Sequence, residues 1–111
     1  MTSPNASGTV TPTDHVAAWL SDHQQRTGVV PARFQKSENP SQLNACYETP
    51  RYLIDITAWD HASCLDIIAL NKATQKEDYV IVGQCADTAC LTQRLECFWQ
   101  WLTSHDEAKV I

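Results

Sequence analysis

A histidine, a cysteine and two aspartates are the side chains whose spacing comes closest to a catalytic pattern. His61 stands three residues before Cys64, the pair that a thiol nucleophile and its base would use. The two residues lie on either side of a predicted turn, and no third group is indicated that would orient the histidine. Asp55 and Asp66 could form a carboxylate pair across two strands, as acid–base catalysis requires. Two solvated carboxylates on an exposed sheet face are the simpler interpretation, so we expect no enzyme activity.

Cofactor chemistry has little support in the sequence. The three glycines are isolated, so no glycine-rich phosphate loop is present. A zinc site needs closely spaced ligand pairs. The five cysteines include no CxxC pair, and the four histidines are scattered: Cys46, Cys64, Cys85, Cys90, Cys97, His15, His23, His61 and His105. We expect no metal and no other cofactor, and we expect the cysteines to act as small buried hydrophobes in a reducing compartment.

Length and charge favour a protein partner over nucleic acid or membrane. The chain has 111 residues, 43% of them apolar, and a formal net charge of −5, from 13 acidic and 8 basic residues. Nucleic-acid binding needs a basic face, which is not visible. An acidic chain suits a basic protein surface, although mild acidity is also typical of soluble proteins. Without a signal-peptide pattern or an apolar run of roughly 20 residues, we expect a cytoplasmic protein. The polar residues 1–10 are predicted to be a disordered tail, and residues 11–111 a single domain.

Two helices and several strands must position these residues. Thr11 and Pro12 predict a helix start, Gly28 predicts its end, and an apolar stripe lies between them: Val16, Trp19, Leu20 and His23. Residues 29–36 predict a strand, which Pro31 confines to a sheet edge. Residues 37–50 are interpreted as a loop, in which residues 43–47 could add a few paired positions. A last helix begins after Asp87, with an apolar stripe that Trp99 and Trp101 widen: Leu91, Leu95, Phe98 and Leu102.

The segment from 51 to 83 predicts three successive strands: 51–59, 64–71 and 78–83. If the first hairpin pairs Trp59 with Cys64, the apolar side chains share one face and the polar ones share the other. The apolar face then holds Ile54, Ile56, Leu65 and Ile67, and the other face holds Asp55, Thr57 and Asp66. The predicted fold class is α+β, an antiparallel sheet of about four strands with an N-terminal and a C-terminal helix packed on one face.

The polar side of this segment is the best candidate for a partner-binding surface. It combines carboxylates with a rigid aromatic of the kind enriched at interfaces, although a tryptophan at a strand end can equally cap the core. The predicted partner-binding residues are Asp55, Thr57, Trp59, Asp60 and Asp66. Trp99 and Trp101 could serve the core, a homodimer or the partner.

The run RYLIDITAWDHASCLDIIALNKATQKEDYVIVG, followed by LTQRLECFWQWL, resembles the immunity proteins of bacterial polymorphic toxins, and among them the TriTu family. The matching features are a YLxDITxW strand, a turn, a Cys-Leu-Asp-Ile strand, a Tyr-containing strand and a Leu-Phe-Trp-Leu helix. The resemblance covers about the last two-thirds of the chain.

The resemblance implies an antitoxin in the cytoplasm of a bacterium. Its partner would be an Rhs-type ADP-ribosyltransferase toxin that is delivered by a type VI secretion system and acts on elongation factor Tu. The antitoxin would bind 1:1 and block the toxin's NAD or substrate cleft. An adaptor or chaperone for a secreted effector is the alternative, since it would also be small, acidic and non-enzymatic. An immunity protein abolishes its partner's activity, whereas a chaperone supports its delivery.

Overall fold

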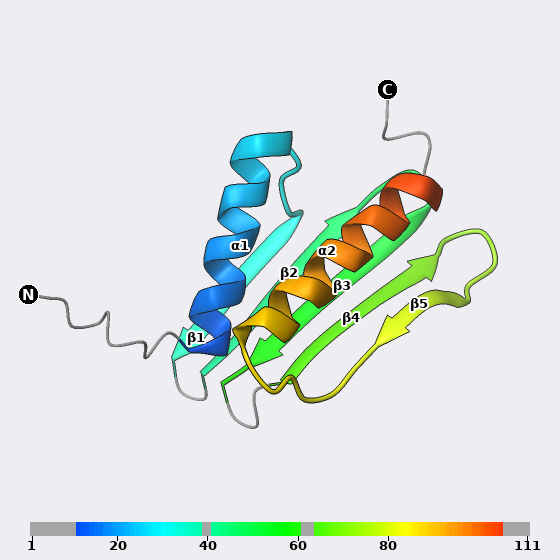
Figure 1. The fold of residues 1–111 in the computed structure, drawn as a ribbon. Coiled ribbons are helices and arrows are strands. Elements are labelled where there is room, and N and C mark those ends of the chain that lie inside the picture. Colours follow the sequence, from blue (N-terminus) through cyan, green and yellow to red (C-terminus); the bar gives the residue numbers. More distant parts are fainter. Residues whose placement is uncertain (1–10, 39–40, 61–63, 106–111) are drawn as a thin grey trace, which may run out of the picture.

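The computed structural model describes residues 11–38, 41–60 and 64–105 (Figure 1). Within these ranges the chain forms two helices and a five-stranded sheet, which confirms the α+β class with one strand more than predicted. The elements are α1 (Pro12–Thr27), β1 (Arg33–Glu38), β2 (Ser41–Glu48), β3 (Tyr52–Trp59), β4 (Cys64–Asn71), β5 (Glu77–Ile81) and α2 (Thr88–His105). The predicted tail 1–10 lies outside the described residues.

The strands form an antiparallel meander in the order β1-β2-β3-β4-β5. The β3–β4 register pairs Trp59 with Cys64, the pairing on which the predicted assignment of faces was conditional. Successive side chains on a strand point to opposite faces, so this register places Ile54, Ile56, Leu65 and Ile67 together on one side. All four are buried, which confirms the predicted assignment of the two faces.

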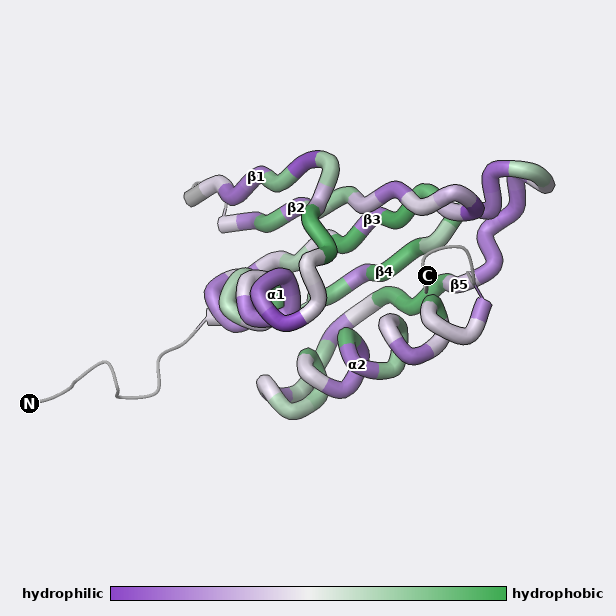
Figure 2. The backbone as a smooth tube through the Cα atoms, turned by 90° about the horizontal axis from the view of Figure 1, so that it is seen from above, coloured by the Kyte–Doolittle hydropathy of each residue, from purple (hydrophilic) through white to green (hydrophobic). Residues whose placement is uncertain are grey.

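Both helices cover the same face of the sheet (Figures 1 and 2). Apolar side chains of the strands and the two helical stripes meet between the layers and form the core. The helices contribute Val16, Leu20, Leu91, Leu95, Phe98, Trp99 and Leu102, and the strands contribute Leu43, Ala45, Tyr47, Tyr52, Ile54, Ile56, Ala58, Leu65, Ile67 and Ala69. Trp101 is partly buried and packs against Tyr52 and Tyr79, so both late tryptophans serve the core.

The interpretation of residues 37–50 as a loop is wrong. Residues 41–48 form β2, a full strand hydrogen-bonded between β1 and β3. Leu43, Ala45 and Tyr47 alternate into the core, but the flanking prolines and the polar residues between them made this period-two pattern look like a loop. The edge position predicted for the strand around Pro31 is confirmed, although β1 begins later, at Arg33.

The ends of both helices follow the predicted capping pattern. The Thr11 hydroxyl accepts a hydrogen bond from the Asp14 backbone N–H at 3.2 Å. Gly28 ends α1 with a φ of 80°, a left-handed conformation that glycine adopts without strain, and its N–H donates to the Gln24 carbonyl. The Asp87 carboxylate accepts from the Cys90 N–H at 3.0 Å, which confirms it as the cap of α2.

The expectation that the cysteines act as small buried hydrophobes is wrong: Cys97 is exposed, Cys46 and Cys64 are only partly buried, and the other two are paired. Cys85 and Cys90 form a disulfide across the turn that leads into α2, with their Cα atoms 5.5 Å apart. A separation of five residues matches no familiar sequence motif, and only the turn brings the two thiols together. Because disulfides are rare in reducing compartments, this pair lends no support to a cytoplasmic location, which stays a prediction. Over the described ranges, neither helix has the length and apolar character required to cross a membrane.

Arg94 joins α2 to the sheet through three hydrogen bonds. Its guanidinium donates to the backbone carbonyls of Leu65 at 2.8 Å, Gly83 at 2.9 Å and Gln84 at 3.0 Å. These carbonyls belong to the start of β4 and to the segment that follows β5. A fixed guanidinium with several donors can satisfy all of them at once. Arg94 therefore holds the end of the sheet against the helix that covers it.

Replacing this arginine tests that role. We expect Arg94→Met to lower the free energy of unfolding by roughly 2–4 kcal/mol, because the half-buried carbonyls of Leu65 and Gly83 each lose a charged donor. Arg26→Met is the matched control, since Arg26 makes an exposed ion pair with Asp22 at 2.8 Å, and its loss should cost about 0.5 kcal/mol or less. Urea unfolding followed by circular dichroism measures both. Equal effects of the two substitutions would contradict the structural role of Arg94.

Candidate binding surface on the open face of the sheet

The face of the sheet opposite the helices is covered by no other described element (Figure 2). We call it the open face. The register places alternate residues of β2, β3, β4 and β5 on it, and these include Asn44, Leu53, Asp55, Thr57, Trp59, Cys64, Asp66, Ile68, Leu70 and Val80. Four of the five predicted partner-binding residues thus share this face: Asp55, Thr57, Trp59 and Asp66. Asp60 lies beyond the end of β3.

A hydrogen-bonded cluster holds the polar centre of the open face. The Asn44 amide donates to Asp55 Oδ1 at 2.8 Å and to Thr57 Oγ1 at 2.9 Å. The Thr57 hydroxyl also donates to Asp55 Oδ1, at 2.8 Å. These bonds fix the Asp55 carboxylate, which is exposed. Sequence reasoning missed Asn44 because its segment was interpreted as a loop. The alternation of Leu43, Ala45 and Tyr47 would have placed Asn44 on this face.

Asp66 and Trp59 lie toward one end of the open face and are partly buried. Asp66 Oδ1 accepts a hydrogen bond from the Gly83 N–H at 3.0 Å, so this carboxylate helps to hold the segment after β5. Trp59 stands between Gln42 and Cys64 on the neighbouring strands. Asp66 thus has a structural contact, and both residues keep an exposed part. A partner could reach them, but they are less accessible than Asp55.

Exposed aliphatic side chains occupy the other part of the open face, and sequence reasoning missed them. Leu53 is 44% exposed, Val80 50%, and Val82, the residue after β5, 55%. Leu53 pairs with Leu70 and Ile68 pairs with Val80, so aliphatic side chains run across three adjacent strands. The signal was present in YVIVG, where Tyr79 and Ile81 face the core and the two valines face outward. Contiguous exposed apolar surface of this kind marks interaction sites.

The carboxylate of Asp60 is already used in hydrogen bonds within the protein. Its Oδ1 accepts from the Thr13 N–H in the first turn of α1 at 2.8 Å, and its Oδ2 accepts from the Ser41 hydroxyl. Burial by itself would raise the pKa of Asp60, but the hydrogen bonds from Ser41 and Thr13 more than offset it and lower the pKa. The carboxylate also lies near the positive end of the helix dipole. It therefore ties α1 to the ends of β2 and β3. The predicted contact of Asp60 with a binding partner stays a prediction.

Within the described residues, the fold does not bring either of the two catalytic patterns considered in the sequence into a catalytic arrangement. His61 lies outside the described residues, and Cys64 lies opposite Trp59 on the open face. Asp55 pairs with Ile68 and Asp66 with Thr57, so the two carboxylates are not directly opposite each other. They also accept from different donors. Among the described residues, no group of three or more potential ligands is suited to a metal ion.

Comparison of the chain with protein-family models, curated proteins and solved structures finds no match. The resemblance to the TriTu immunity proteins therefore stays a prediction from the sequence.

The lowered pKa of Asp60 predicts how the stability of the protein depends on pH. A depressed folded-state pKa contributes stability above the unfolded value of about 3.9, and this contribution is lost as the pH falls through the folded value. Asp60→Asn should therefore be less stable than the wild type at pH 7, by about 1 kcal/mol. It should also lose less stability between pH 5 and about pH 2.

Urea unfolding at a series of pH values measures this difference. Asp22→Asn is the matched control, because Asp22 is an exposed carboxylate on α1, the helix that Asp60 contacts. If the stability of Asp60→Asn followed the wild-type pH curve in parallel, the proposed tie would be wrong.

Proposed function

We propose that the protein is an immunity protein that binds a cognate secreted toxin through the open face and neutralises it by blocking its NAD or substrate cleft. The observation that carries this proposal is an uncovered sheet face that combines exposed aliphatic side chains with a fixed carboxylate. Leu53, Val80 and Val82 supply the apolar part, and Asp55 supplies the charge.

The chemistry of the open face suits a protein partner. Interfaces combine an apolar centre with a polar rim, and a few well-packed residues supply most of the binding energy. A rigid antiparallel sheet presents such residues at little cost in conformational entropy, because its backbone is already ordered. The net charge of −5 favours a basic partner surface and accelerates association with it. A standard interface would bury about 1,600 Å² in total.

The class of toxin rests on the sequence resemblance. The residues that resemble the TriTu family form β3, β4, β5 and α2, so the proposed binding surface and the resemblance involve the same strands. On that basis the partner is an Rhs-type ADP-ribosyltransferase that modifies elongation factor Tu, bound 1:1 in the bacterial cytoplasm. Neutralisation requires no chemistry by this chain.

Expression of the toxin encoded beside this gene tests the proposal. The toxin alone should stop growth, and co-expression with this protein should restore it. In vitro, the purified protein should suppress transfer of labelled ADP-ribose from NAD to elongation factor Tu, with complete inhibition at one equivalent. A protein that bound the toxin but left its transferase activity unchanged would be an adaptor or chaperone, and the proposal would be wrong.

Substitutions on the two sides of the sheet locate the binding surface. We expect Leu53→Arg and Val80→Arg each to weaken toxin binding about tenfold or more, because they place a charge in the apolar centre of the interface. Ala18→Arg, at an exposed position on α1, is the matched control and should bind like the wild type. Isothermal titration calorimetry measures the affinities, and circular dichroism checks the fold. Loss of binding in Ala18→Arg alone would place the interface on the helices.

A further inference from the structure

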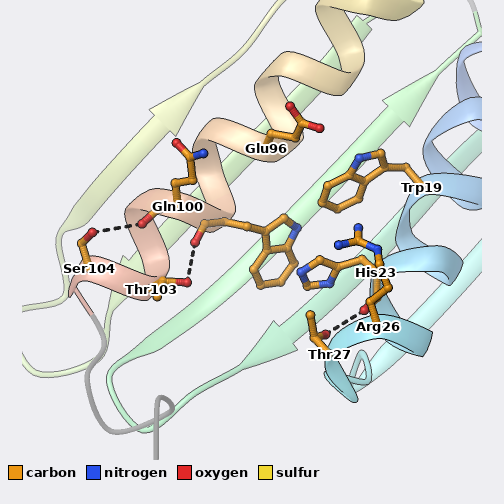
Figure 3. Close-up of a pocket in the computed structure, with 9 residues that line it drawn as sticks. Trp19, His23, Arg26, Thr27, Glu96, Gln100, Thr103 and Ser104 are labelled. Carbon is orange, nitrogen blue, oxygen red and sulfur yellow. Dashed lines mark hydrogen bonds between the residues drawn. The ribbon is translucent and has the colours of Figure 1, made fainter.

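A groove lies between α1 and α2, on the side of the sheet that the open face does not use (Figure 3). Its volume is about 660 Å³, within the range of roughly 300–1,000 Å³ that is typical of small-molecule sites. The two helices run side by side in the same direction, since His15 contacts Thr92 near their starts and His23 contacts Trp99 about two turns later. Trp19 and His23 reach from α1 toward α2 (Figure 3).

Aromatic rings line the groove. Trp19 stacks on His23 with ring centroids 5.0 Å apart, and His23 stacks on Trp99 at 4.5 Å. His23 and Trp99 are buried, with exposed fractions of 8% and 7%, whereas Trp19 is only partly buried. Planar rings that are already ordered in this way suit a flat ligand, because stacking then requires little reorganisation.

The indole nitrogen of Trp99, which lines the groove, has no hydrogen-bond partner among the described residues. The indole nitrogen of Trp99 is a donor, is shielded from solvent and donates to no acceptor there. A buried donor without an acceptor costs free energy, and an acceptor that reached it would recover that cost. A tryptophan nitrogen can only donate, so the matching ligand atom must be an acceptor.

The rim on α2 supplies an acceptor about one helical turn before this donor. Glu96 precedes Trp99 by three residues, which is close to one helical turn, and it also lines the groove. Glu96 and Gln100 are exposed, and their side chains make no hydrogen bond or ion pair within the part of the chain that the structure describes. Exposed side chains change rotamer within nanoseconds, so these two can turn toward a ligand in the groove.

We propose that this groove binds a planar nitrogen heterocycle that carries a ring-nitrogen acceptor next to an amino group, as in adenosine. The ring stacks on the aromatic lining, the ring nitrogen accepts from the Trp99 indole N–H, and the amino group donates to the Glu96 carboxylate. This site is distinct from the open face and does not depend on the proposed function.

Titration of the ¹⁵N-labelled protein with adenosine tests the site. The indole N–H resonance of Trp99, assigned by its absence in Trp99→Phe, should shift downfield and reach saturation. Inosine is the matched ligand, because it has the same rings but replaces the acceptor and amino group by a ring N–H and a carbonyl. It should bind at least about tenfold more weakly, because both proposed hydrogen bonds are lost. An unsaturable shift, or equal affinity for the two nucleosides, would overturn the proposal.

Protein variants provide a second test of the proposed site. Trp99→Phe keeps a ring but removes the donor, and should weaken adenosine binding about tenfold. Trp101→Phe is the control, because Trp101 packs on Tyr52 and Tyr79 and does not line the groove. Glu96→Ala alters an exposed residue and remains testable if Trp99→Phe fails to fold. An upfield shift of the Trp99 indole resonance in ligand-free Glu96→Ala, together with wild-type affinity for adenosine, would show that Glu96 itself accepts from the Trp99 N–H. The proposal would then be wrong.

Discussion

The alternation of side chains along β3 is the constraint on which the rest of the structure depends. Tyr52, Ile54, Ile56 and Ala58 are buried, and the residues between them face the other way. A shift of the strand by one residue would bury Asp55 and expose the isoleucines, so the register with β2 and β4 is strongly determined. Burial of one sheet face also decides where both helices lie, because their apolar stripes can be covered only there.

This constraint leaves the molecule with two different surfaces. The face without helices keeps apolar residues such as Leu53 and Val80 in contact with solvent, beside the carboxylate that Asn44 and Thr57 hold in place. On the other side, two parallel helices meet through an aromatic stack and leave a groove above it. The first surface is broad and suits a protein, whereas the second is concave and suits a small ligand.

Several polar residues that looked available in the sequence are used by the fold. Asp60 accepts from the first turn of α1, Asp66 holds the segment after β5, and Arg94 satisfies three backbone carbonyls. Each of these ties joins segments distant in sequence, so no local pattern could indicate it. Asp55 differs, because its bonds come from Asn44 on β2 and from Thr57 on its own strand, and they leave it exposed. Compared with the prediction from the sequence, the candidate binding surface therefore has fewer available carboxylates and more aliphatic residues.

Local pattern alone determined the two capped helices, the β3–β4 hairpin and the separation of apolar from polar faces, because each depends on residues close together in the chain. Tertiary structure decided what depends on distant neighbours. Residues 41–48 became β2 once strands on both sides could satisfy their backbone groups, and Cys85 met Cys90 only through the turn before α2. Likewise, Trp59 and Asn44 share the open face, and Trp99 lines a groove, only because the sheet and the helices are packed together.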